Sequence, residues 1–252
     1  MNFNRNILFL ICLLIPLVTF SQENKAGLPP AILVNFEFGF NTPGGDLSNR
    51  FGNNLDAGGG VEYITKKGNL IFGLQSTFYF GNVVKEDVLS EIRNSDGFLI
   101  GNNKINANVV LRQRGLYIGG SIGKIFSLNQ FNARSGIRAT LGVGLFQHKI
   151  RVQEDPTSFV PIVAGDYKKG WDRLSNGLAL RQFIGYQHLS SNGLINFYAG
   201  FEFMQAFTEN RREQDFKTMA KLEEKRLDLM YGFKVGWTLP FIVGQSADEI
   251  FY

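Results

Sequence analysis

Strict alternation of apolar and polar residues is the feature that most constrains what this chain can fold into. Residues 31–41, 137–145, 195–207 and 227–239 all show it. In the first of these, the apolar face consists of Val34, Phe36, Phe38 and Phe40. A period of two marks a β-strand with one apolar and one polar face. A tilted strand of about 9–11 residues crosses a bilayer, whereas sandwich strands are nearer about 5–6 residues. Strand length therefore favours a transmembrane barrel over a secreted β-sandwich.

The same reasoning along the whole chain predicts an all-β fold, an eight-stranded antiparallel transmembrane β-barrel. The expected strands are 31–41, 56–65, 70–82, 109–126, 135–153, 177–188, 194–207 and 226–239. An even number of strands suits a closed bacterial barrel. Closure is required in lipid because an open sheet edge would leave backbone groups without hydrogen-bond partners.

Short and long connections alternate strictly. Short turns are expected at 66–69, 127–134 and 190–193, and long connections at 42–55, 83–108, 154–176 and 208–225. Outer-membrane barrels combine short periplasmic turns with long outer loops. The alternation therefore predicts an outer-membrane location with both ends of the mature chain in the periplasm, and a sandwich gives no reason for it.

The N-terminus has the pattern of a secretory signal peptide. Arg5 precedes the apolar run 7–20, and small residues precede the expected cleavage between Ser21 and Gln22. Cys12 lies inside the apolar run and lacks the small preceding residue of a lipoprotein site, so the only cysteine leaves with the signal. The expected organisation is a signal peptide at 1–21, a barrel at 22–240 and a periplasmic tail at 241–252.

Composition excludes several classes of function. The mature chain has a charge near +3, with basic residues dispersed among acidic ones, which is not the pattern of a nucleic-acid-binding protein. The chain has 2 His and shows no metal-spaced His/Cys cluster and no Gly-rich phosphate loop. We therefore expect no cofactor and no metal.

Charged residues on the polar faces are expected to form a paired network inside the barrel. They are Glu37, Glu62, Arg138, Arg181, Glu202 and Lys234. An eight-strand lumen is only wide enough for side chains, and a charge out of water needs a partner. The functional alternative is a proton or ion path, which would make the protein a small channel.

One hairpin allows a prediction of register. If Leu189 pairs with Leu194, Arg181 lies directly opposite Glu202, and both fall on the polar face. An opposite-charge cross-strand pair supports that register.

His188, Ser190 and Glu202 resemble in spacing the His, Ser and Glu of outer-membrane lipid A deacylases, which are also eight-stranded barrels. The resemblance implies a nucleophilic serine activated by a histidine base. The chain departs from the family pattern because Ser191 stands where the family has Asn. In the expected register His188 faces lipid, Glu202 faces inward, and the two lie about 23 Å apart along the hairpin. A polar turn with an interfacial histidine is the competing interpretation, and no enzyme is expected. No Ser or acid is expected in a comparable arrangement around His148.

The long loops and the tail are expected to make contacts with partners. Residues 84–93 have the spacing of a short amphipathic helix. Tyr63, Tyr79, Tyr186 and Trp237 are candidates for the aromatic girdle at the membrane surface. Candidate partner contacts are Arg211, Arg212, Phe216, Trp171, Phe251 and Tyr252. The tail beyond Pro240 is either an assembly signal or a periplasmic contact peptide.

Two segments resemble small outer-membrane barrels of the Bacteroidota, of the PorT-like group. They are Thr42-Pro43-Gly44-Gly45-Asp46-Leu47 followed by Gly58-Gly59-Gly60-Val61-Glu62-Tyr63, and Gly115-Leu116-Tyr117-Ile118-Gly119-Gly120. That group is linked to type IX secretion and gliding. The resemblance implies a non-enzymatic accessory protein that contacts outer-membrane lipid and other outer-membrane or periplasmic proteins of a secretion complex. It transfers no catalytic residue.

Overall fold

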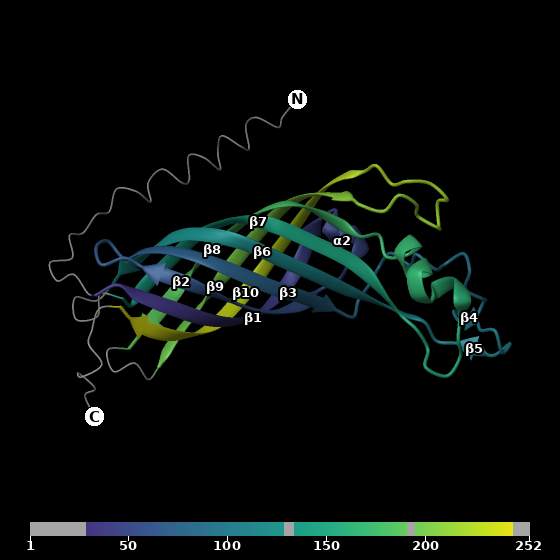
Figure 1. Cartoon of the computed structure of the whole chain (residues 1–252), viewed down its shortest axis with the longest axis horizontal. Helices are drawn as coiled ribbons and strands as arrows, with labels where there is room; N and C mark the ends of the chain where they lie inside the picture. Colours follow the sequence, from purple (N-terminus) through teal and green to yellow (C-terminus); the bar gives the residue numbers. More distant parts are fainter. Residues whose placement is uncertain (1–28, 129–133, 191–194, 244–252) are drawn as a thin grey trace.

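Eight long antiparallel strands form a closed barrel in the computed structural model, which describes residues 29–128, 134–190 and 195–243 (Figure 1). Around the barrel the order is β1-β10-β9-β8-β7-β6-β3-β2, and β2 pairs with β1 to complete the ring. The expected fold class is confirmed. The strands are β1 (Ala31–Gly45), β2 (Asn54–Ile64), β3 (Leu70–Gly81), β6 (Val110–Ser127), β7 (Gly136–Gln153), β8 (Ser175–Leu189), β9 (Asn196–Asn210) and β10 (Lys225–Ile242).

The last strand runs past the proline that was expected to end it. Pro240 lies inside β10 opposite Leu33, and the strand ends at Ile242. On its other side β10 pairs with β9 only as far as Trp237, opposite Phe197. Because Pro240 lies beyond that ladder, its missing N–H breaks no bond to β9.

The predicted register of the β8–β9 hairpin is wrong by two residues. Leu189 pairs with Asn196, and Arg181 lies opposite Met204. Glu202 lies opposite Phe183. A shift of two residues preserves which side chains point inward, because strand side chains alternate with a period of two. The predicted faces are therefore right although the direct cross-strand pair is not.

The long connections contain short elements that the sequence did not reveal. They are α2 (Leu47–Arg50), a two-stranded sheet of β4 (Leu99–Ile100) and β5 (Asn106–Ala107), and two 3₁₀ turns at Pro161–Val163 and Gly165–Gly170.

The helix expected over residues 84–93 is wrong. The N–H of Lys85 donates to the carbonyl of Arg50, and an oxygen of Asp87 accepts from the N–H of Leu89. The first contact bonds a backbone N–H to a distant part of the chain and the second bonds one to a nearby side chain, and both compete with helical hydrogen bonding. The apolar face was correctly identified, since Val88 and Leu89 are fully buried.

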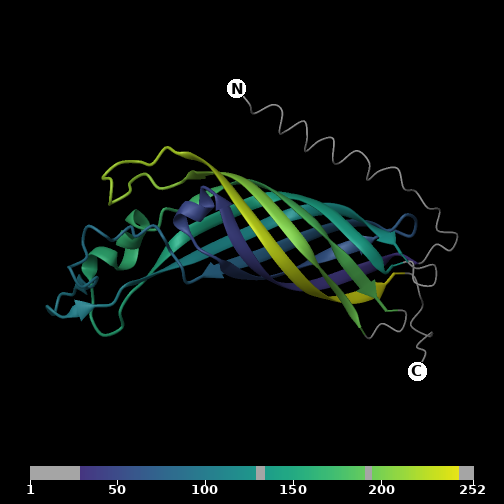
Figure 2. The ribbon, with the colours of Figure 1, turned by 180° about the vertical axis from the view of Figure 1, so that it is seen from behind.

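The connections 46–53, 82–109, 154–174 and 211–224 gather at one end of the barrel and are called the loop cap (Figures 1 and 2). Their apolar side chains share one core with the part of the lumen that lies next to the cap. In this core, loop residues such as Leu47 and Leu89 join strand residues such as Tyr79 and Phe146. A second apolar cluster fills the lumen at the short-turn end and consists of Ala31, Leu33, Ile64, Ile71, Ile125 and Leu189. The cap is thus continuous with the barrel core.

Within the described ranges, none of the helices combines the length and the hydrophobicity that crossing a membrane requires.

Candidate functional site

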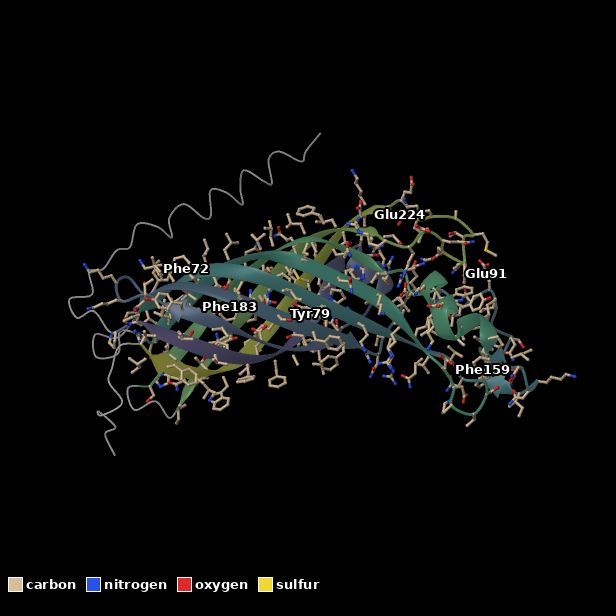
Figure 3. All side chains as sticks on the ribbon, viewed as in Figure 1. Phe72, Tyr79, Glu91, Phe159, Phe183 and Glu224 are labelled. Carbon is tan, nitrogen blue, oxygen red and sulfur yellow. The ribbon has the colours of Figure 1, made fainter. Side chains whose placement is uncertain are left out.

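The outer wall of the barrel is covered by exposed apolar side chains. Phe38, Leu74 and Leu145 are 67%, 72% and 66% exposed, and Figure 3 shows Phe72 on the same wall. Burying such a surface in hydrocarbon is favourable, whereas exposing it to water is not. A closed antiparallel barrel with an apolar exterior is the architecture of outer-membrane proteins. The chain is therefore an outer-membrane β-barrel.

Three of the four expected girdle aromatics face outward. Tyr63, Tyr186 and Trp237 are exposed on the wall. Tyr79 was assigned wrongly: its side chain is fully buried inside the barrel, where its ring lies 5.3 Å from the ammonium of Lys234. Its position on β3 has the same parity as the buried Thr77, so the alternation of side chains along the strand places it inside.

Arg181 is the centre of the polar layer inside the barrel. Its Nη2 lies 2.9 Å from Glu37, and its Nε donates to Glu202 at 2.7 Å. Its Nη1 donates to the hydroxyl of Thr77 at 2.9 Å, and Tyr198 donates to the other oxygen of Glu37. All of these groups are buried, so each charge is matched by a partner as low-dielectric surroundings require.

The other two bases of the layer are paired in the same way. Lys234 lies 2.6 Å from Asp56 and 3.4 Å from Glu202. Arg138 forms an ion pair with Glu62, and its guanidinium lies over the ring of Tyr198, 4.6 Å from the ring centre. The structure thus brings together all six predicted network residues and adds Asp56; we call these seven the interior network. Asp56 shares the parity of Glu62 on β2, a signal that was present in the sequence.

The interior network leaves little empty space. A cavity of about 10 Å³ lies within it and is lined by residues that include Glu37, Arg138 and Arg181. About one water molecule fits in such a volume. The apolar clusters above and below the network close the lumen at both ends. In the described part of the barrel, charged side chains thus occupy the middle of the lumen, and apolar clusters lie on either side of them.

A second buried polar cluster lies between the interior network and the loop cap. The Nε2 of His148 on β7 is 2.8 Å from Asp228 on β10, and both side chains are fully buried. Thr208 donates to the same carboxylate, and Arg226 lies 3.3 Å from it. Sequence reasoning did not pair His148 with an acid, because the pairing crosses the lumen between strands that are not neighbours.

The residues that resemble a deacylase site do not come together. His188 lies on the outer face of β8, and its ring packs on Phe197. Glu202 is buried in the interior network and is bound by Arg181. In the observed register the two are about 17 Å apart along the hairpin. Ser190 donates its backbone N–H to Asn196, and the hydroxyl that lies 3.3 Å from His188 belongs to Ser135. A base and its orienting acid must be in hydrogen-bond reach, and His188 and Glu202 are not.

Ion pairs hold the loops of the cap together. Arg50 in α2 donates to Glu86 at 2.9 Å, and Glu86 also pairs with Arg173. Arg173 in turn lies 2.8 Å from Asp215 in the β9–β10 loop. Burial lowers the pKa of Arg50, as does the charge of Arg226, while Glu86 opposes them. One chain of alternating charges thus links all four connections.

Two of the predicted partner contacts are already used inside the cap. Trp171 is 3% exposed, and its indole N–H donates to the carbonyl of Ile162, so its assignment as a partner contact was wrong. Phe216 packs edge-on against Trp171.

The two arginines lie at the edge of the cap. The hydrogen bond from Arg212 to Asp172 raises the pKa of the arginine. Arg211 remains partly exposed beside Glu209. Phe251 and Tyr252 lie outside the described residues.

The tip of the cap carries a groove of about 320 Å³ between the 82–109 and 154–174 connections. Its lining consists of the apolar residues Ile92, Leu99, Ile100, Val160 and Ile162 and the polar residues Glu91, Arg93 and Asn94. Ile100, Ile162 and the neighbouring Phe159 are exposed, and Glu91 and Phe159 mark this end of the molecule in Figure 3. Exposed apolar residues around a groove are typical of a protein-binding surface.

No group of His, Cys, Asp and Glu side chains in the described ranges has the arrangement of a metal site.

No family model and no curated protein matches this chain. Solved structures that are similar include Neisserial surface protein A (13% identity, 84% of this chain and 99% of that chain, TM-score 0.46). The attachment invasion locus protein Ail of Yersinia pestis has 10% identity over 84% and 99% of the two chains, with a TM-score of 0.36. The N-terminal β-barrel domain of Pseudomonas aeruginosa OprF has 11% identity over 86% and 99%, with a TM-score of 0.33. These TM-scores are low, and the barrel architecture follows from the strand pairing of this chain itself.

Proposed function

We propose that the protein is a non-enzymatic outer-membrane barrel whose loop cap binds another protein of the cell envelope. The observation that carries the proposal is the groove at the tip of the cap. Its apolar residues Ile100 and Ile162 are exposed to water beside the exposed Phe159, although the cap also has a buried apolar core to which Leu47, Leu89 and Trp171 belong. A solvent-exposed apolar groove on a packed scaffold is stabilised when a partner covers it.

The filled lumen supports a role in display rather than in transport. Ion pairs occupy the middle of the barrel, and apolar clusters occupy both ends. A barrel of this kind holds the cap at a fixed height above the membrane and needs no opening. By the usual orientation of such barrels, the long loops face outward and the short turns face the periplasm.

The process that we propose is type IX secretion or gliding, in which the protein would be an accessory component. Support for this finer assignment is the resemblance of residues 42–47, 58–63 and 115–120 to PorT-like barrels. These segments lie at the end of β1 and in β2 and β6, so the resemblance concerns the barrel wall and its first long connection.

Affinity purification from outer membranes with a tagged full-length copy tests the proposal. The wild type should recover a partner protein that the Ile100→Asp/Ile162→Asp variant loses. Met219→Asp is the matched control, because Met219 is an apolar residue in a different loop of the cap and is 74% exposed. Recovery of the bare protein alone in all three cases would contradict the proposal. Loss of the partner in the control as well would show that the groove is not its binding surface.

A further inference from the structure

Four cationic side chains meet on the outer wall of the barrel just below the loop cap. Arg112 on β6 lies directly opposite Arg151 on β7, and Arg114 lies directly opposite Lys149. All four have the outward parity of their strands, the parity of the exposed Leu116 and Leu145. We call these four residues the cationic patch.

No acidic side chain in the described ranges forms an ion pair with the cationic patch. Arg112 donates to the amide oxygens of Gln153 and Asn82, and Arg114 donates to the backbone carbonyl of Gln113. Arg112 and Arg151 are close enough to Arg114 for their like charges to act on it. In contrast, every base of the interior network has a carboxylate partner.

Two like-charged pairs directly opposite each other on neighbouring strands destabilise a sheet. The patch therefore lowers the stability of the isolated barrel. An anion that binds between the two strands would offset the repulsion and restore that stability. Arginine is suited to this role because its planar guanidinium donates two parallel hydrogen bonds to a phosphate.

The patch lies at the height where lipid headgroups begin. Below Arg114 the outward residues of β6 are apolar, beginning with Leu116 and Ile118, until Lys124 is reached. Arg114 and Lys124 are about 33 Å apart along the strand at about 3.3 Å per residue. A tilt of about 40° reduces this to about 25 Å across the membrane, the height of the apolar band of such barrels.

We propose that the cationic patch binds the phosphate groups of a phosphorylated glycolipid of the lipid A type in the leaflet next to the loop cap. The membrane supplies the occupant because the apolar side chains directly below the patch bind its acyl chains. The proposal depends on the long loops facing outward, but it does not depend on the cap binding a partner protein.

Binding to the purified full-length protein in detergent tests this, with diphosphoryl lipid A and the same lipid without phosphates as probes. Wild type is expected to bind the diphosphoryl form more tightly, and Arg112→Gln/Arg151→Gln should lower that affinity on the order of tenfold or more. Lys66→Gln/Lys67→Gln is the matched control, because it removes two exposed cations from the opposite end of the barrel and should change nothing. Equal affinity of wild type and the patch variant would overturn the proposal, as would equal affinity for the two lipids.

Two further measurements separate the remaining explanations. Inorganic phosphate alone at millimolar concentration should leave diphosphoryl lipid A bound, and complete displacement of the lipid would make the patch a free-phosphate site instead.

In phosphatidylcholine vesicles the patch variant should unfold in urea at a midpoint no lower than that of wild type, because removing like charges relieves repulsion. A lower midpoint there would assign the patch a structural role and overturn the proposal. No protein partner is present in either measurement, so a failure of the proposed function leaves these results unaffected.

Discussion

His148 and Asp228 form a fully buried pair with 2.8 Å between Nε2 and the carboxylate oxygen, and they join β7 to β10 across the lumen beneath the loop cap. The same carboxylate accepts from Thr208 and lies 3.3 Å from Arg226. One aspartate therefore connects three strands and a cation close to the cap. Neither partner is reached by water, so the pair depends on its own hydrogen bonds.

Asp228→Ala is expected to destabilise the barrel by about 3–5 kcal/mol, because it leaves His148 and Arg226 without their buried partner. Urea unfolding in detergent, followed by tryptophan fluorescence, measures this. The control is Asp166→Ala, which removes an exposed carboxylate from an ion pair with Lys169 and should leave the midpoint unchanged. Similar midpoints for Asp228→Ala and wild type would mean that the pair contributes little.

Lys234→Met is expected to cost about 3–5 kcal/mol, because Asp56 and Glu202 lose a buried cation. Adding Asp56→Leu to this variant should recover most of the loss, since the uncompensated carboxylate is then removed. A double-mutant cycle measured by urea unfolding gives the coupling energy of the two residues. Additive effects would show that the ion pair does not act as a unit.

Leu145→Arg is expected to destabilise the membrane-inserted barrel by about 2–4 kcal/mol, because it places a charge in the hydrocarbon layer. Ile100→Arg is the matched control: Ile100 is nearly as exposed but lies in the cap, where water can solvate the charge. Refolding into lipid vesicles in a series of urea concentrations compares the two. An equal cost at both positions would contradict the assignment of Leu145 to the lipid-facing wall.

Planar bilayers containing the purified protein should show no conductance steps, because the interior network and the two apolar clusters fill the lumen. A porin measured in the same bilayers serves as the positive control. Reproducible steps from the purified protein would support the channel hypothesis instead.

Trp171→Ala is expected to loosen the loop cap while the barrel remains closed. The indole fills the cap core against Phe216, and its loss leaves a cavity that costs about 3–5 kcal/mol of local stability. Limited proteolysis should cleave the cap connections faster in the variant, whereas the heat-modifiable mobility of the barrel in gels should be unchanged. Unchanged cleavage would show that the cap does not depend on this contact.

The sequence predicted the wall of the barrel well. Alternation assigned Phe38 to the outside and Glu37 to the inside, and the pairing confirms eight strands in a closed barrel. What alternation does not contain is the register between strands. A slip of two residues leaves both faces intact, so Leu189 could be paired with Leu194 rather than with Asn196 without any conflict in the pattern.

Contacts across the lumen could not be predicted for a related reason. Asp228 reaches His148 only after the sheet has closed and the strands are staggered around the barrel. Neither the closure of the sheet nor the stagger of its strands can be read from the sequence of a single strand. The helix prediction for the Val84–Arg93 segment was wrong for a different reason. Its apolar residues were recognised, but backbone contacts such as Lys85 to Arg50 come from distant parts of the chain and override the local helical spacing.

The distribution of charge in the interior network has a consequence for how the protein is assembled. The first two strands contribute only acids to it, namely Glu37, Asp56 and Glu62, whereas the bases Arg138, Arg181 and Lys234 belong to β7, β8 and β10. Until the two ends of the chain meet at the β1–β10 seam, the nascent sheet carries negative charge on its leading hairpin and positive charge on its trailing strands. Arg181 is already bound by Glu202 on the neighbouring β9, and closing the seam adds the contacts of Glu37 with Arg181 and of Asp56 with Lys234, so electrostatic attraction favours joining the first strand to the last.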